Sequence, residues 1–219
     1  MQSWLNNPLI FEDPRRLTGP SGWIGHIPFA FFLINLLKPG LFVELGVHTG
    51  NSYNAFCQAV DLLSLKTRCF GVDNWKGDLH SSLYNEEIYS DLREYQAESY
   101  PTFSTLLKLD FDEACKKFDD HSIDLLHIDG FHTYEAVKHD FENWLPKLSE
   151  SSVVLLHDTQ VRYSDFGVWK FWQEISSSYS VFDFYHSFGL GIVKTGEKAD
   201  NSLFSMTPEE QQFFRTFFR

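Results

Sequence analysis

Short apolar runs along the chain alternate with longer stretches in which apolar residues recur at helical spacing. Five runs of strand length are each followed by such a stretch, and this alternation is typical of a parallel sheet with crossover helices. The predicted strands are 41–45, 68–72, 102–109, 123–128 and 152–156, and the predicted helices are 51–64, 85–99, 111–118, 133–145 and 169–176. The pattern therefore predicts a doubly wound α/β fold.

The two ends of the chain have different patterns. Residues 1–20 are irregular, and 23–37 have the composition of an apolar helix that Lys38-Pro39-Gly40 would end. Segments 181–185 and 190–194 flank a Ser-Phe-Gly turn, which indicates an antiparallel hairpin, and 208–218 has the spacing of an amphipathic helix. We expect one domain over 1–219, with an N-terminal cap segment (1–40), a core (41–195) and a C-terminal tail helix (196–219).

Composition restricts the class of protein. The chain has 219 residues, of which 43% are hydrophobic, and this is enough for a full core. The net charge of −12 disfavours binding to nucleic acid, which depends on Lys and Arg. The apolar run 27–37 is too short to span a bilayer, and three cysteines without metal spacing fit reduced thiols. We expect a cytoplasmic protein with a small-molecule or sugar substrate and no membrane or nucleic-acid partner; a homo-oligomer is compatible with this composition.

The end of the first predicted strand carries the first sign of a ligand site. Glu44 ends the strand, and the turn Gly46-xxx-Gly50 leads into a helix, where backbone can approach a ligand closely. Asp73 ends the second strand, 23 residues after Gly50, which suits a hydrogen bond to a ribose diol. The loop lacks both the dinucleotide and the P-loop glycine patterns. A carboxylate at Glu44 favours a cationic ligand such as S-adenosylmethionine.

Acidic residues also follow the later strands. Asp110 ends the third, and Asp129 and Asp158 end the fourth and fifth, which should be neighbours. Two adjacent carboxylates repel unless a cation or a proton lies between them. Oxygen ligands of this kind favour Mg²⁺ or Mn²⁺, and His157 next to Asp158 would shift the preference towards a transition metal.

These segments resemble class I S-adenosylmethionine-dependent methyltransferases, whose first motif is acidic-x-Gly-x-Gly-x-Gly; here His48 replaces the middle glycine. The run I-D-G-x-H-x-Y and the later H-D-T resemble the methyltransferase-domain branch of this class. They are also similar to macrocin-type sugar O-methyltransferases and, more distantly, to catechol-type metal-dependent O-methyltransferases. The resemblance covers roughly 23–195. It implies a Rossmann-like methyltransferase fold with a seven-stranded, mostly parallel sheet, and an S-adenosylmethionine-dependent O-methyltransferase that acts on a small-molecule or sugar hydroxyl, assisted by Mg²⁺ or Mn²⁺.

The resemblance also implies a role for each candidate residue. The cofactor-binding positions are Glu44, Gly46 and Gly50 at the methionine part, Asp73 at the ribose and Asp110 near the adenine. The metal-binding positions are Asp129 and Asp158, with His157 beside them. His132, three residues after Asp129, takes the place of the general base. Thr159 stands where catechol-type enzymes have a metal-binding Asn.

Several alternatives remain open from the sequence. Asp129 could instead cap the following helix, and His132 could lie on the surface of its first turn. A His127-x-Asp129 pair with His157 matches the two-His-one-carboxylate iron site of an oxygenase, although His127 is expected to pack inside its strand. His48 in the glycine loop supports a binding module that keeps the nucleoside site without catalysis.

Overall fold

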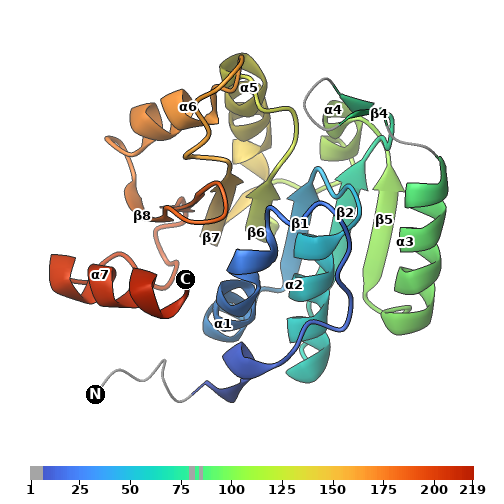
Figure 1. Ribbon diagram of the computed structural model, residues 1–219, viewed down its shortest axis with the longest axis horizontal. Helices are drawn as coiled ribbons and strands as arrows, with labels where there is room; N and C mark the ends of the chain where they lie inside the picture. Colours follow the sequence, from blue (N-terminus) through green and yellow to red (C-terminus); the bar gives the residue numbers. More distant parts are fainter. Residues whose placement is uncertain (1–6, 79–81, 84–85) are drawn as a thin grey trace.

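The computed structural model describes residues 7–78, 82–83 and 86–219. A seven-stranded sheet in the order β5-β2-β1-β6-β7-β9-β8 forms its centre (Figure 1). The strands are β1 (Leu41–Leu45), β2 (Arg68–Asp73), β5 (Ser104–Lys108), β6 (Ile123–Ile128), β7 (Leu148–His157), β8 (Ser180–Phe184) and β9 (Leu190–Lys194). Strands β5 to β7 in this order are parallel, and β9 pairs antiparallel with both β7 and β8. The predicted fold class is confirmed.

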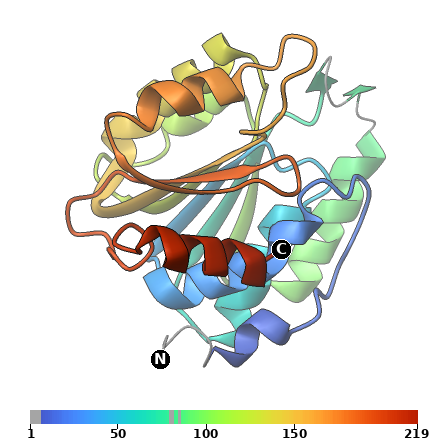
Figure 2. The same cartoon turned by 60° about the vertical axis from the view of Figure 1, so that its left-hand side comes forward.

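Helices cover both faces of the sheet, as Figure 2 shows. One face carries α1 (Ile27–Leu37), α2 (Asn51–Leu62), α3 (Glu86–Ser99) and α7 (Pro208–Phe217). The other carries α4 (Phe111–Cys115), α5 (Tyr134–Trp144) and α6 (Val168–Ile175). Short 3₁₀ turns lie at η2 (Pro8–Phe11), η3 (Ile24–His26) and η4 (Leu145–Lys147). Each face buries its own apolar cluster, which is why the central strands are apolar on both sides.

The predicted elements differ from the structure mainly at their ends. The helix expected over 23–37 begins with the η3 turn, and α1 follows with Pro28 in its first turn, where a missing N–H costs little. The last parallel strand is longer than predicted because a register shift against β6 accommodates the polar residues that follow Leu148. Part of the expected loop 74–83 forms a small ribbon of β3 (Gly77–Asp78) and β4 (Ser82–Leu83).

The topology determines where the loops of the candidate site meet. Strand β1 lies between β2 and β6, so the chain leaves β1 towards one side of the sheet and later returns to the other side. Ligands of such sheets bind at the carboxyl ends of the strands, at this switch point. Among the described helices, none is long and apolar enough to cross a membrane.

Candidate active site

The turn after β1 has an unusual backbone conformation. Gly46, His48 and Gly50 have positive φ values of 87°, 52° and 88°. A Cβ atom on Gly46 would lie 2.0 Å from the carbonyl oxygen of Asp129, so only glycine fits there. Histidine is among the residue types that enter the left-handed region more readily. His48 therefore keeps the backbone shape of the loop in the place of the middle glycine.

Asp73 at the end of β2 fixes this turn. Its Oδ2 accepts a hydrogen bond from the N–H of His48 at 2.9 Å, and its Oδ1 accepts one from the N–H of Trp75 at 2.7 Å. The side chain is only slightly exposed, and burial raises the pKa of Asp73 although both N–H groups oppose this. A carboxylate oxygen has a second lone pair, so Asp73 can still accept hydrogen bonds from a ligand.

A cavity of ≈ 260 Å³ lies between the loops that follow β1, β2, β5 and β6. Among the residues that line it are five of the predicted site residues, namely Gly46, Asp73, Asp110, Asp129 and His132. Asp110 lies beside Asp73 at this edge and accepts a hydrogen bond from the side chain of Asn74 at 2.9 Å. The cavity is thus lined by the positions expected for the nucleoside.

Two residues predicted to bind the cofactor lie behind the loop instead of in the cavity lining. Glu44 is 0% exposed; it accepts a hydrogen bond from the Ser52 hydroxyl at 2.8 Å, and its other oxygen lies 2.9 Å from Nδ1 of His127. Gly50 immediately precedes α2, and a Cβ atom there would lie 2.6 Å from the side chain of Leu92 in α3. Both residues support the loop after β1 from the side that faces away from the cavity.

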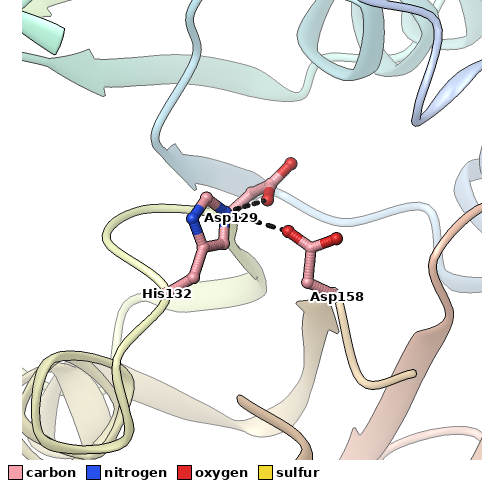
Figure 3. A group of neighbouring side chains, drawn as sticks. All are labelled: Asp129, His132 and Asp158. Atoms are coloured by element: carbon pink, nitrogen blue, oxygen red, sulfur yellow. Dashed lines mark ion pairs between the residues drawn. The ribbon is translucent and has the colours of Figure 1, made fainter. Parts of the chain in front are cut away.

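Three side chains converge where β6 and β7 end (Figure 3). Nε2 of His132 lies 2.9 Å from Oδ2 of Asp158 and 3.6 Å from Oδ1 of Asp129. One ligand atom from each of these residues lies within 4.8 Å of the others, as a shared cation requires. Two carboxylates and an imidazole suit a divalent cation, so the donor set fits the predicted metal. Thr159 is buried, and its hydroxyl group lies beside Gly189.

His157 lies next to this group and contacts it through one ring nitrogen. Its Nδ1 is 3.2 Å from Oδ1 of Asp129, and its Nε2 is 3.0 Å from the carbonyl oxygen of Ser187, in the turn between β8 and β9. Both neighbours are acceptors, so both ring nitrogens carry protons and the ring is cationic. The same Nδ1 lies 3.6 Å from Oδ1 of Asp158, so the protonated side chain contacts both carboxylates and holds Asp129 in place.

The charges of the site balance one another. Burial alone would lower the pKa of His132, but Asp129 and Asp158 raise it to about 9. Burial opposes charge on His157 too, and the same two carboxylates raise its pKa well above the usual value. Burial would raise the pKa of Asp129, but His157 and His132 hold it well below its usual range. Without a metal, protonated histidines therefore supply the positive charge between the carboxylates.

Three of the alternatives left open by the sequence are wrong in this structure. Thr133, not Asp129, caps α5, because its hydroxyl accepts a hydrogen bond from the N–H of Ala136. His132 points at Asp158 and is not a surface residue. His127 is 0% exposed and faces Glu44 and Trp23, so the iron triad that includes it is not formed.

Aromatic rings that the sequence did not single out form one side of a second cavity. This cavity, of ≈ 370 Å³, shares Gly46, His48, Asp129 and His132 with the first and extends past Asp158. Tyr163, Phe166 and Phe188 contribute to its lining, and we call these three residues the aromatic rim. The ring of Phe166 stacks on that of His132, with centroids 4.9 Å apart. The sequence contains 22 Phe, but no local pattern marks these three positions.

Comparison with known proteins gives a consistent result. The family described as "Methyltransferase domain" matches residues 43–159. A putative caffeoyl-CoA O-methyltransferase from Staphylococcus aureus has a similar structure, with a TM-score of 0.60, 15% identity, and coverage of 81% of this chain and 84% of that one. A Podospora anserina methyltransferase solved with S-adenosylhomocysteine also has a TM-score of 0.60, with 14% identity and 77% of each chain covered. At these identities the likeness shows the fold.

One relative is much more similar in sequence. The Sinorhizobium fredii protein y4gI is 46% identical over 199 residues, which are 91% of this chain. The match spans only 22% of that relative.

Proposed function

Since the chain belongs to the methyltransferase-domain family, we propose that it transfers a methyl group from S-adenosylmethionine to a hydroxyl group of a small molecule or sugar, with a divalent metal assisting. The observation that carries this proposal is the convergence of Asp129, His132 and Asp158 beside the cavity that holds Asp73 and Asp110. A nucleoside pocket and a carboxylate pair open to each other are what a metal-assisted methyl transfer requires.

Each part of the first cavity has a place in cofactor binding. S-adenosylmethionine supplies an electrophilic methyl group on a sulfonium centre. Asp73 accepts hydrogen bonds from the ribose hydroxyls, and Asp110 lies on the adenine side. Gly46 lets the loop pass close to the backbone of Asp129, while Glu44 and Gly50 stabilise the loop from the side away from the cavity. This arrangement positions the methyl group towards the second cavity.

Asp129 and Asp158 would hold the metal, Mg²⁺ or Mn²⁺, and His157 orients Asp129. The metal, when bound, lowers the pKa of the acceptor hydroxyl. His132 accepts the proton of that hydroxyl, because its ring lies at the boundary of both cavities. A base must be neutral, so His132 has to lose the proton that the two carboxylates now stabilise. A divalent cation held by the two carboxylates would lower the pKa of His132, so that the neutral ring could accept the proton.

Calorimetry with S-adenosylhomocysteine tests the proposal before any acceptor is known. The wild type should bind, and Asp73→Ala should bind about 10- to 100-fold more weakly, because a hydrogen bond to a charged group contributes about 1.5–3 kcal/mol. Asp119→Ala is the matched control, since Asp119 is exposed and lies after α4, outside both cavity linings. Absence of binding to the wild type would overturn the proposal. Binding by Asp73→Ala as tight as by the wild type would remove the assigned role of Asp73.

A further inference from the structure

The aromatic rim presents unusually exposed rings beside the carboxylates. Tyr163 is 64% exposed and Phe188 is 52% exposed, although both line the second cavity. The rings of Tyr163 and Phe166 are 5.0 Å apart, so the rim continues from solvent to His132, on which Phe166 stacks. Apolar rings left open at a concave site are typical of a surface that binds a ligand.

The turn between β8 and β9 is built to hold Phe188 at this place. Ser187, Phe188 and Gly189 have successive positive φ values of 49°, 69° and 90°, which is costly for the first two. The turn is fastened because the carbonyl oxygen of Phe188 accepts from the N–H of Gln160 at 2.8 Å, and that of Ser187 accepts from His157. The segment that presents the ring thus also contacts the side chain that orients Asp129.

The charges around the second cavity distinguish one class of acceptor from another. Among the described residues that line it, none is Lys or Arg, whereas Asp129 and Asp158 are both present. The segments outside the described residues contain no Lys or Arg in their sequence either. Arg162 is next to Tyr163 in sequence, but its guanidinium stacks on the ring of Trp169. Neither Arg162 nor Trp169 lines the cavity. His132 and His157 also line the cavity, but they are already paired with Asp158 and Asp129. A phosphate or carboxylate would therefore lose its hydration without gaining an unpaired cationic side chain.

We propose that the acceptor is an uncharged molecule whose ring packs against the aromatic rim, and that phosphorylated, carboxylated and coenzyme A-linked acceptors are rejected. This inference rests on the proposed function, since it describes the acceptor side of the same site. An uncharged sugar and an uncharged phenol share the chemistry in question, because each combines hydroxyl groups with a face that can stack on an aromatic ring. Either one could stack on the aromatic rim, and the experiment distinguishes between them.

The test compares matched pairs of ligands that differ by one charged group. Saturation-transfer NMR and calorimetry, with S-adenosylhomocysteine and Mg²⁺ present, would compare catechol with 3,4-dihydroxybenzoate, and methyl glucoside with glucose 6-phosphate. At least one uncharged member should bind about 10-fold or more tightly than its charged partner, and the pair that responds identifies a phenol or a sugar. Tighter or equal binding of the charged partners, or no binding of either uncharged ligand at millimolar concentration, would overturn the inference.

Variants locate the binding at the rim. Phe188→Ala and, separately, Tyr163→Ala should weaken the uncharged ligand about 3- to 10-fold, the range of one aromatic contact. Phe213→Ala is the matched control, because Phe213 is 51% exposed but lies on α7. Unchanged affinity in both variants would show that the ligand does not bind at the aromatic rim. Tyr163→Ala keeps the test valid if Phe188→Ala does not fold because its turn is strained. The S-adenosylhomocysteine affinity, measured first, separates the outcomes: its absence defeats the proposed function, whereas its presence without the expected selectivity defeats only this inference.

Discussion

Breaking the buried pair of Glu44 and His127 should destabilise the protein strongly, whereas neutralising it should not. Both side chains are 0% exposed. Trp23 donates its indole N–H to Nε2 of His127 at 3.3 Å, so the proton of a neutral ring lies on Nδ1, which faces Glu44 at 2.9 Å. Burial raises the pKa of Glu44, and His127 and Ser52 oppose that rise. The carboxylate is thus kept in the core by two donors.

The size of each effect follows from these contacts. His127→Leu leaves one oxygen of a buried carboxylate without its donor, which costs about 3–5 kcal/mol. Glu44→Gln keeps a carbonyl for His127 and turns an amide towards the Ser52 hydroxyl, so about 1 kcal/mol is lost. For a chain of this length, about 1 kcal/mol corresponds to about 2–4 °C in Tm. We therefore expect Tm to fall by about 6–20 °C in His127→Leu and by about 2–4 °C in Glu44→Gln.

Urea denaturation and calorimetry would check both the stability and the role of Glu44. The double variant Glu44→Leu/His127→Leu should be less destabilised than His127→Leu alone, because two apolar residues replace a charge and its partner. The reasoning would be refuted if the double variant lost as much stability as His127→Leu or more. A loss below about 1 kcal/mol in His127→Leu would also refute it. Glu44→Gln should bind S-adenosylhomocysteine within a few-fold of wild type; a stable variant with 10-fold weaker binding would show that Glu44 contacts the cofactor.

Two further predictions concern the metal and a second buried carboxyl. Asp158→Asn should weaken Mn²⁺ binding, measured by electron paramagnetic resonance, by at least about 10-fold, whereas Asp119→Asn should not, and equal binding in both would exclude this metal site. In the wild type, Mn²⁺ affinity should rise with pH up to about 9, because the proton on His132 competes with the cation. Burial raises the pKa of Asp140 from 3.8 to about 7, so its protonated form stabilises the fold below pH 4 and this contribution is lost as the pH rises through 7. Asp140→Asn should therefore stabilise the protein at pH 8, by at most about 4 kcal/mol in urea denaturation, and change little at pH 4; equal stability at pH 8 would contradict this.

The strands, the order of helices and the carboxylates at the sheet edge were predictable because they depend on local pattern. Apolar runs bounded by acidic residues identify parallel strands and their ends, so Asp73, Asp110, Asp129 and Asp158 could be placed at one edge. The order of the strands in the sheet determines where residues close to a strand end lie.

What the sequence could not give depends on contacts between distant segments. Glu44 meets His127 across neighbouring strands, and the resulting pair removes Glu44 from the cavity lining. The ring of His157 links Asp129 to the carbonyl oxygen of Ser187, 30 residues later. Phe188 reaches the site only through the β8–β9 turn. Periodicity does not predict such pairings, because each depends on the packing of two segments that are far apart in sequence.

His132 cannot be both the general base and a metal ligand through the same nitrogen, and the two roles predict opposite results for His132→Ala. Its Nε2 lies between the two carboxylates, and the stacked ring of Phe166, 14° from parallel, holds the plane of the imidazole. If His132 is the base, the variant should lose about 100-fold in turnover once an acceptor is known. Its Mn²⁺ affinity at neutral pH should be unchanged or higher, because a competing proton has been removed. If His132 is a ligand, Mn²⁺ affinity should instead fall by at least about 10-fold. We expect the first result, since Asp129 and Asp158 already supply the charge that a divalent cation needs. A clear loss of Mn²⁺ binding in His132→Ala would transfer the role of base to another group.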